Sequence, residues 1–415
     1  MKTVFPPALV LAGSPHGNLG IVRTLGRLGL PVYIVETRNG SPASQSRYCA
    51  GSFVWDFTAT DEAETVGFLM DCGKSLGSGC LLFPTCDDDA ILAASHYGTL
   101  SKWFAFPAQS PELVRSLVSK KEMYFLARKH GIPVPQASFP QNMEEAISFS
   151  ETATFPVVAK GIDGARLKRA LGAGVIIADH QEDLFGIYRQ LEKADHSNVM
   201  LQEFIPGGDE RVWMFNGYFD HNSDCRFGVT GKKIRQYPAY TGATSLGICA
   251  PNPTVERTTI RWMKELGYKG ILDIGYRYDE RDGKYKVLDV NPRIGATFRL
   301  FVDRGGLDVA RVLYLDLAGK PVRTSPVHNH RKWIVEDADV GSSLRYHRDG
   351  KLTFSQWLRS LAGIQEAAYF ARDDMGPFRS ICTRTLRKKI QNKSLGILQK
   401  KRVSVKRAKA LVERV

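Results

Sequence analysis

Apolar and polar positions follow three different patterns along the chain. Over residues 1–118, short apolar runs such as ALVLAG, LPVYIVE and CLLFPT alternate with turns and helical stretches, which is typical of βαβ units around a parallel sheet. Residues 119–327 carry longer amphipathic helices and antiparallel hairpins, and residues 328–378 hold one predicted helix, over Phe354–Phe370. A basic tail follows over residues 379–415. We therefore predict an α/β N-terminal βαβ domain, an α+β second domain and a helical, basic C-terminal extension.

The second domain contains a hairpin, Ile271–Arg293, that gathers polar side chains on one face. Its turn is DERDG at Asp279–Gly283, between two runs rich in β-branched and aromatic residues. Strands that pair symmetrically about Arg281 would put Asp273 directly opposite Asp289, about 5 Å apart at Cβ. Two like charges in that position destabilise a hairpin unless a counter-ion joins them. The pattern favours an ion site over the alternative of a polar, solvent-facing hairpin.

The ligands of this predicted ion site are oxygen atoms. Side chains alternate along a strand, so Asn291 joins Asp289 on the same face. Two carboxylates and an amide oxygen suit Mg²⁺ better than zinc. Arg293 follows on the same side, where a cation fits if a phosphate bridges the metal. We predict a metal–phosphate site made of Asp273, Asp289, Asn291 and Arg293.

Two lysines stand beside segments that suit phosphate binding. Lys160 ends the buried strand FPVVAK and precedes GIDGARLKRALGAGV, a predicted loop with four glycines and three cations. Such a loop covers polyphosphate through backbone N–H groups and positive charge, although solvated basic loops are common. Lys120 opens the helix KKEMYFLARKHG and, taken alone, is typical of a surface lysine. The sequence leaves open which loop cation contacts phosphate: Arg166, Lys168 or Arg169.

A second buried strand ends in VMLQEFIPGGDER. It bears Glu203 and exits at Pro-Gly-Gly, so the free backbone groups beside Phe204 and Ile205 suit the edge of a purine. Glu210, seven residues after Glu203, is placed to reach ribose hydroxyls. The alternative is an ordinary strand exit with acidic caps.

Glycines after the first strand imitate a dinucleotide fingerprint. Gly13, Gly17 and Gly20, with Glu36 ending the next strand, have the spacing G-x₃-G-x₂-G, which makes the turn one residue too long. The pattern favours a generic βα turn over a nicotinamide site. A nicotinamide-dependent oxidoreductase is kept as an alternative, although it explains nothing after Ser119.

Taken in order, these motifs resemble the ATP-grasp superfamily of carboxylate–amine ligases. The order is Lys120, GIPVP, VVAK with Lys160, the Gly-rich loop, LQEFIPGGDE, Asp273 and DVNPR. The resemblance covers roughly residues 1–325 and is nearest to the carbamoyl-phosphate-synthase-like and D-aspartate-ligase-like members. It implies a pre-ATP-grasp domain over residues 1–118 and an ATP-grasp domain over residues 119–327.

The resemblance also implies roles for single residues. Lys120 and Lys160 would bind the phosphates of ATP, Glu203 and the backbone near Ile205 would hold adenine, and Glu210 would hold the ribose.

The same resemblance implies the metal ligands. Asp273, Asp289 and Asn291 would ligate Mg²⁺, with Mn²⁺ as an alternative, and Arg293 would contact the γ-phosphate or an acyl-phosphate. Asp289 replaces the more usual Glu, and Ser119 stands where an Asp often precedes the first lysine.

The implied reaction joins a carboxylate to an amine. MgATP would convert the carboxylate to an acyl-phosphate, and the amine would then displace phosphate. Arg235, within residues 231–246, is a candidate contact for the substrate carboxylate, with solvated hairpin charge as the alternative. A non-catalytic ATP-binding protein is a further alternative, disfavoured by the presence of the metal-site residues.

Composition and charge indicate where the protein resides and what it contacts. Seven cysteines without a CxxC pair favour a reducing cytoplasm. Of the net charge of +14, the tail from Arg379 carries +12, with 13 Lys and Arg against Glu413. We interpret the tail as a solvated extension or as a peripheral contact with the anionic inner membrane surface. Nucleic acid is disfavoured because aromatic residues are absent after Phe378. The substrates would be small or lipid-linked, and a homo-oligomer is an open alternative.

Overall fold

The N-terminal domain is built on a parallel five-stranded sheet. The structure is a computed structural model that describes residues 6–172 and 174–385. The strands pair in the order β3-β2-β1-β4-β5. They are β1 (Ala8–Val10), β2 (Val32–Glu36), β3 (Cys49–Val54), β4 (Cys80–Phe83) and β5 (Phe104–Ala105), connected by the helices α1 (Pro15–Gly26), α2 (Glu62–Leu76), α3 (Asp87–Ser95) and α4 (Tyr97–Leu100). The predicted α/β class of this domain is confirmed, since a sheet of buried parallel strands needs helices on its faces.

Two helices lead from this domain into the next. They are α5 (Pro111–Val118) and α6 (Lys120–Lys129). Ser119 separates them, and its Oγ accepts a hydrogen bond from Glu122 N at 3.3 Å, which begins α6.

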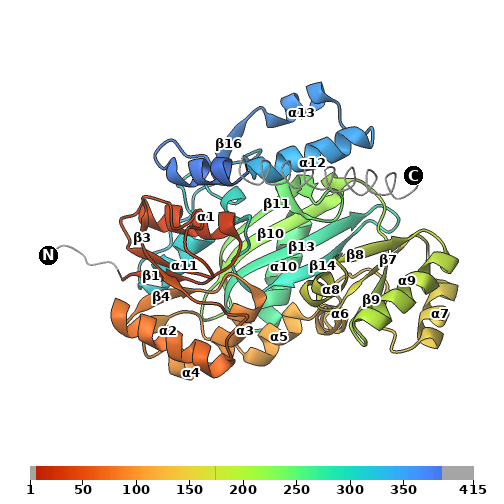
Figure 1. Ribbon diagram of the computed structural model, residues 1–415, viewed down its shortest axis with the longest axis horizontal. Coiled ribbons are helices and arrows are strands. Elements are labelled where there is room, and N and C mark those ends of the chain that lie inside the picture. Colours follow the sequence, from red (N-terminus) through yellow and green to blue (C-terminus); the bar gives the residue numbers. More distant parts are fainter. Residues whose placement is uncertain (1–5, 173, 386–415) are drawn as a thin grey trace, which may run out of the picture.

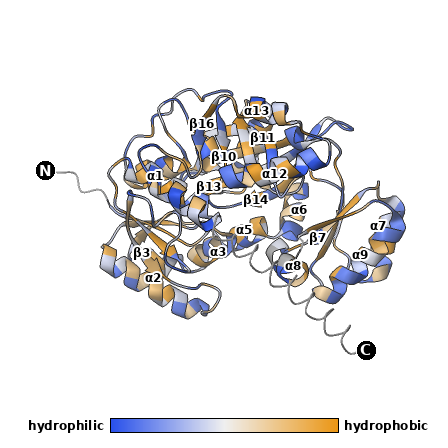
Figure 2. Cartoon of the chain, turned by 45° about the horizontal axis from the view of Figure 1, so that its top comes forward, coloured by the Kyte–Doolittle hydropathy of each residue, from blue (hydrophilic) through white to orange (hydrophobic). Residues whose placement is uncertain are grey.

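A small antiparallel sheet forms the outer lobe of the second domain. Its strands pair in the order β6-β9-β7-β8. The elements are β6 (Ala137–Ser138), α7 (Met143–Thr152), β7 (Val157–Gly161), α8 (Gly164–Leu171), β8 (Val175–Ala178), α9 (Gln181–Ala194) and β9 (Val199–Glu203). Figure 2 shows β7 in hydrophobic colours beside α7 and α9, whose ribbons carry both colours, as expected for helices with one face on a core.

A seven-stranded sheet forms the centre of the molecule (Figure 1). Its order is β14-β13-β10-β11-β12-β15-β16. The elements are η1 (Asp209–Arg211), β10 (Val212–Phe219), β11 (Cys225–Tyr237), β12 (Ala243–Cys249), α10 (Pro253–Glu265), β13 (Gly270–Asp279), β14 (Lys284–Asn291), η2 (Phe298–Leu300), α11 (Val309–Leu317), β15 (Lys332–Ile334) and β16 (Ile364–Ala367). One apolar core joins α1, α11 and this sheet, so the first domain is packed firmly against the second.

The C-terminal extension is built into this central sheet. Its strands β15 and β16 pair with β12 and with each other. Two further helices, α12 (Glu336–Arg348) and α13 (Phe354–Leu361), run along the top of the molecule in Figure 1. The helix predicted over Phe354–Phe370 is wrong beyond Leu361, because Ala362 is extended and Gly363 has φ +77°.

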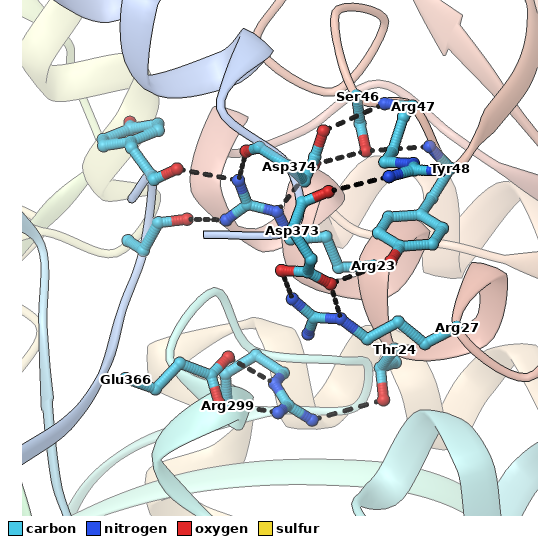
Figure 3. Close-up of polar contacts among 12 residues, drawn as sticks. Arg23, Thr24, Arg27, Ser46, Arg47, Tyr48, Arg299, Glu366, Asp373 and Asp374 are labelled. Carbon is cyan, nitrogen blue, oxygen red and sulfur yellow. Dashed lines mark hydrogen bonds and ion pairs between the residues drawn. The ribbon is translucent and has the colours of Figure 1, made fainter. Parts of the chain in front are cut away.

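Arginines of α1 hold the segment that follows β16 (Figure 3). Arg23 is buried and donates to Asp374 Oδ2 at 2.9 Å and to the carbonyl oxygens of Ala368 and Tyr369. One turn later, Arg27 makes a paired contact with Asp373 at the surface. The N-terminal helix and the C-terminal extension are therefore tied to each other directly.

No helix in the described part of the chain is long and apolar enough to cross a membrane. Most of the basic tail predicted over residues 379–415 lies outside the described residues.

Candidate active site

A cleft of about 560 Å³ opens between the small sheet and the central sheet. Eight residues singled out in the sequence line it: Lys120, Lys160, Glu203, Ile205, Asp273, Asp289, Asn291 and Arg293. They come from α6, β7, the end of β9 and the β13–β14 hairpin. Segments far apart in the sequence thus meet at one place, as the ordered motifs predicted.

The register of the β13–β14 hairpin differs from the prediction. Asp273 pairs with Asn291, and Asp289 pairs with Gly275, because the register shifts between Gly275 and Tyr276. Leu288 is the extra residue of this β-bulge. The predicted direct opposition of the two aspartates is therefore wrong, although both still lie on the cleft face.

The glycines around the two carboxylates leave them room. A Cβ at Gly275 would meet Asp289 Oδ1 at 2.5 Å, and a Cβ at Gly295 would meet Asp273 Oδ2 at 2.3 Å. Glycine is the one residue that lets both carboxylates fold in so closely. The backbone thus forms a cradle for a pair of acidic groups.

The charged form of Asp273 is disfavoured in this position. Burial, and then the charge of Asp289, raise the pKa of Asp273 to about 6, against the opposing influence of Arg293, Asn216 and Lys233. Asn291 lies beside them, and its Nδ2 donates to Asp289 Oδ2 at 3.2 Å. Two crowded carboxylates beside an amide fit Mg²⁺, because a hard divalent cation takes oxygen ligands and removes the repulsion.

Arg293 lies between the acidic pair and the N-terminal domain. Its Nε donates to Asp87 Oδ1 at 2.7 Å, and its Nη2 donates to Asn291 Oδ1 at 3.1 Å. The guanidinium is thereby fixed beside the metal ligands, with Asp87 of α3 as its counter-ion. Asp87 is a residue that the sequence interpretation missed.

The two lysines both line the cleft and lie close enough for their charges to interact. Lys120 Nζ donates to the carbonyl oxygen of Ile162 at 3.1 Å. Burial and the charge of Lys120 lower the pKa of Lys160 to about 8, while Asp289 raises it. Both side chains are placed for an anionic ligand, which would relieve their mutual repulsion.

The predicted Gly-rich loop after Lys160 is mostly a helix, α8 (Gly164–Leu171). Arg166 makes an ion pair with Asp195 and is not turned to the cleft. Arg169 is exposed, and the side chain of Lys168 lies outside the description. The interpretation of this segment as an irregular loop is therefore wrong, because its spaced apolar residues bury Leu167 in the core of the small lobe.

At the end of β9, the cleft is bounded by backbone and apolar groups. The Glu203 carboxylate accepts from Lys286 Nζ at 3.0 Å and from Arg281 Nη2 at 2.7 Å, so its charge is already matched. The carbonyl oxygen of Ile205 accepts from Arg277 Nε at 2.8 Å. The cleft wall here includes Val158, Ile177, Met214 and Leu288. An apolar slot beside a strand exit suits a flat aromatic base.

Glu210 does not line the cleft. Its side chain is 62% exposed and folds back over Gly208, where a Cβ would meet Glu210 Oε2. The neighbouring Asp209 is buried instead and accepts from Gln236 Nε2 at 2.8 Å. The prediction that Glu210 holds a ribose has no support in this geometry.

Arg235 is also placed away from the cleft. Its guanidinium is buried and makes a two-bond contact with Asp339, at 2.8 and 2.9 Å, and a third bond with Ser360. The prediction that Arg235 contacts the substrate carboxylate is therefore wrong, because its guanidinium is buried against Asp339 and does not line the cleft.

Lys233 lines the cleft, where the sequence led us to expect Arg235. It donates to Gly242 O at 2.9 Å and to Gln236 Oε1 at 3.0 Å. Burial lowers its pKa, which the charges of Asp289, Asp209 and Asp273 oppose. Simple alternation puts positions 233 and 235 on one face, but irregular pairing on both sides of Arg235 turns them apart.

The N-terminal glycines serve close packing. A Cβ at Gly17 would meet Ala296 Cα at 3.0 Å, and a Cβ at Gly20 would meet Phe298 Cε1 at 2.9 Å. The favoured interpretation of this turn as a generic βα connection fits these contacts, because the glycines bring α1 against the segment after β14.

Known proteins resemble the chain in both sequence and fold. It is 25% identical over 249 residues to D-aspartate ligase of Enterococcus faecium, covering 57% of this chain and 58% of that protein. It is 24% identical over 210 residues to the N-terminal section of the carbamoyl phosphate synthase large chain of Methanopyrus kandleri, covering 49% of this chain and 36% of the relative. The chain thus spans less than two thirds of either relative. No protein-family model matches it.

A solved structure agrees with this sequence likeness. The biotin carboxylase domain of 2-oxoglutarate carboxylase from Hydrogenobacter thermophilus, in complex with MgADP, ADP and bicarbonate, superimposes with a TM-score of 0.61. It is 15% identical and covers 80% of this chain and 74% of that chain. The motif order, the sequence relatives and the fold agree, and the chain is similar in both sequence and fold to the ATP-grasp carboxylate–amine ligases that its motifs resemble.

Proposed function

We propose that the chain is an ADP-forming ligase that activates a small-molecule carboxylate with ATP and couples it to an amine. One observation carries the proposal: a single cleft brings two lysines and an arginine together with two neighbouring carboxylates, Asp273 and Asp289, and burial and the charge of Asp289 raise the pKa of Asp273. Phosphoryl transfer needs positioned charge more than it needs an acid or a base. The relatives named above support the same chemistry.

The basic and acidic residues of the cleft bind different parts of MgATP in this proposal. Lys120 and Lys160 bind the phosphates, and the backbone at Ile205 with the surrounding apolar wall holds the adenine. Asp273, Asp289 and Asn291 hold Mg²⁺, or Mn²⁺ in its place.

The metal neutralises phosphate charge when it is bound. Arg293 stabilises the transferring phosphoryl group and the acyl-phosphate that results. Its contact with Asp87 holds the guanidinium in place for both steps.

The proposed reaction has two steps, phosphorylation of the carboxylate and then attack by the amine. A carboxylate oxygen attacks the γ-phosphorus, the bond to the β-phosphate oxygen breaks, and ADP leaves. The amine nitrogen then attacks the acyl carbon, phosphate leaves, and the amine proton passes to solvent or to a base. Lys233 lies close enough to the acidic pair to influence its charge and is a further candidate for contact with the donor carboxylate.

The competing functions have less support. A nicotinamide oxidoreductase would use the N-terminal turn, whose glycines are occupied by packing contacts. A non-catalytic nucleotide-binding protein has no need for two carboxylates and an arginine arranged around the same point.

We infer a cytoplasmic enzyme that acts on small molecules. Lipid-linked substrates and a homo-oligomer are alternatives that rest on the sequence alone.

Mg²⁺-dependent ADP release tests the proposal. The purified chain is incubated with ATP and with amino acids and other small carboxylates and amines, singly and in pairs. We expect ADP only with a particular pair. ADP release that needs no carboxylate, or ATP binding without release for any pair, would contradict the proposal.

A variant pair tests the metal site. Asp289→Ala should lower ADP release at least a hundredfold, because one of the two carboxylates that hold the metal is lost. Glu280→Ala, which removes an exposed carboxylate at the tip of the same hairpin, should leave the rate near that of wild type. Equal activity of the two variants would mean that the metal binds elsewhere.

A further inference from the structure

The loop between β11 and β12, residues 238–242, forms one wall of the cleft beside Lys233. Tyr240, Thr241 and Gly242 of this loop line the cleft, and Gly242 O accepts from Lys233 Nζ at 2.9 Å. Tyr240 has φ +71°, a left-handed conformation that tyrosine rarely adopts. Such a conformation persists only where the surrounding structure holds it. The contacts that hold Tyr240 therefore bear on the shape of the cleft.

Tyr346 of α12 contacts this loop without lining the cleft. Its Oη accepts a hydrogen bond from Tyr240 N at 3.1 Å, and the two rings pack edge to face with 4.7 Å between their centroids. The Tyr240 hydroxyl donates in turn to Oδ2 of Asp349, the C-cap residue of α12, at 2.8 Å. The backbone and the side chain of Tyr240 are thus both attached to the C-terminal extension.

The Tyr346 hydroxyl also connects the loop to a buried carboxylate. It donates to Asp209 Oδ2, and the two residues are only 7% and 8% exposed. Burial first, and then the bond to Asp209, raise the pKa of Tyr346, so the hydroxyl keeps its proton and remains a donor. A phenol has one O–H to donate, which here is used on Asp209, while its oxygen accepts from the loop.

Gln236 extends these contacts to Lys233. Its Nε2 donates to Asp209 Oδ1 at 2.8 Å and to Tyr240 O at 3.2 Å, and its Oε1 accepts from Lys233 Nζ at 3.0 Å. A continuous chain of hydrogen bonds therefore runs from Tyr346 through Asp209 and Gln236 to the lysine that lines the cleft. Because the cleft loop is bonded to the same groups, its position and that of Lys233 both depend on α12.

We propose that Tyr346 is a positioning residue for the carboxylate donor. It holds the loop and Asp209 so that Lys233 and the backbone of Tyr240–Gly242 bind the donor in the cleft. The inference rests on the proposed function, since it concerns the affinity for one substrate of that reaction. Lys120 and Lys160 belong to α6 and β7, outside this chain of hydrogen bonds, so ATP binding should not depend on Tyr346.

A pair of tyrosine variants separates positioning from stability. Tyr346→Phe keeps the ring but removes the acceptor of the Tyr240 amide and a donor to Asp209. Tyr218→Phe is the matched control, because Tyr218 is also buried, its hydroxyl donates to Asp316 Oδ2 at 2.6 Å, and it does not line the cleft. Each variant leaves a buried aspartate without a hydrogen bond, so both should lower the midpoint of urea denaturation.

Trapping with hydroxylamine measures donor binding without an amine substrate. Hydroxylamine attacks the acyl carbon of the acyl-phosphate, phosphate leaves, and a hydroxamate forms. The carboxylates tested are both enantiomers of each standard amino acid, acetate and succinate. We expect Tyr346→Phe to raise the donor KM at least fivefold, while its KM for ATP stays within twofold of wild type. Both KM values of Tyr218→Phe should stay within twofold of wild type.

Amide hydrogen exchange reports on the loop in the protein without substrates. The amides of residues 240–242 should exchange at least tenfold faster in Tyr346→Phe, because the Tyr240 amide loses its acceptor and the loop is held less firmly. In Tyr218→Phe they should exchange as in wild type.

Each outcome decides a separate question. An unchanged donor KM in Tyr346→Phe overturns the inference and leaves the ligase proposal in place. A donor KM raised equally in both variants is an effect of destabilisation and overturns the inference as well, as does a raised donor KM without faster exchange of the loop. Absence of hydroxamate with every carboxylate tested in the wild-type protein overturns the ligase proposal and the inference with it.

Discussion

At the scale of single residues, the cleft is built from like charges held near one another. Lys160 lies near Lys120, and Asp273 lies near Asp289. Burial first, and then the like charge of the neighbour, lower the pKa of Lys160 and raise the pKa of Asp273. Such an arrangement costs free energy in the empty protein and is relieved by a ligand of opposite charge. The nucleotide phosphates suit the lysines, and a divalent cation suits the carboxylates.

The lowered pKa of Lys160, about 8, predicts an alkaline limit for nucleotide binding. Below this pH the ammonium is charged and attracts phosphate. As the pH rises through 8 the lysine loses its proton, so the KM for ATP should increase about tenfold by roughly pH 9. Lys160→Arg keeps its charge and should remove this rise.

ADP release between pH 6.5 and 9.5 checks this expectation. Lys121→Arg, next to Lys120 on α6, is the control and should behave as wild type. A wild-type KM that stays flat through the whole range would show that Lys160 does not contact the phosphates.

At the scale of elements, the helix α1 is joined to the C-terminal extension by two ion pairs. Arg23 in its last turn contacts Asp374, and Arg27, its C-cap residue, contacts Asp373 (Figure 3). The Arg23 and Asp374 side chains are 5% and 2% exposed, whereas those of Arg27 and Asp373 are 29% and 44% exposed. Two ion pairs on one helix thus differ mainly in burial.

This difference predicts unequal effects on stability. Arg23→Ala should lower the free energy of unfolding by about 3–5 kcal/mol, because the buried Asp374 loses its counter-ion. Arg27→Ala should lower it by about 0–1 kcal/mol, since water already screens that pair. Urea denaturation of both variants measures the two values, and equal losses would contradict the assignment of Arg23 as the buried anchor.

At the scale of the whole molecule, most of the net positive charge lies near one end of the sequence. Residues 386–415 carry a net charge of +10 of the total +14, and the cleft is lined by residues that precede them. The central sheet meanwhile takes strands from both the predicted second domain and the predicted extension. Function in the cleft should therefore depend on residues up to 385 and not on the tail.

Deletion of residues 386–415 tests this separation. The rate of ADP release should stay within twofold of that of the full chain. The midpoint of urea denaturation should be unchanged within error. Binding to vesicles that contain phosphatidylserine should be lost if the tail contacts anionic lipid, since each basic residue near such a surface contributes about 1 kcal/mol. Vesicle binding that is equally weak before and after the deletion would end the membrane interpretation of the tail.

The sequence by itself determined the local features of this protein. Ser119 caps α6 and so places Lys120, a buried apolar strand ends at Lys160, and the turn DERDG joins two strands that carry Asp273 and Asp289. Each of these depends on residues only a few positions apart, and capping, alternation and turn chemistry act over that range. Taken in order, these local features predicted the ATP-grasp resemblance and most of the singled-out residues that line the cleft.

Only the tertiary structure decided which neighbouring side chains face the cleft. Because of the bulge at Leu288, Asp273 and Asp289 are not paired directly across the hairpin as predicted. Because of the irregular pairing beside Arg235, Lys233 lines the cleft and Arg235 does not. A bulge arises where a strand adjusts to the strands and helices packed against it, and it reverses the side-chain direction that alternation predicts.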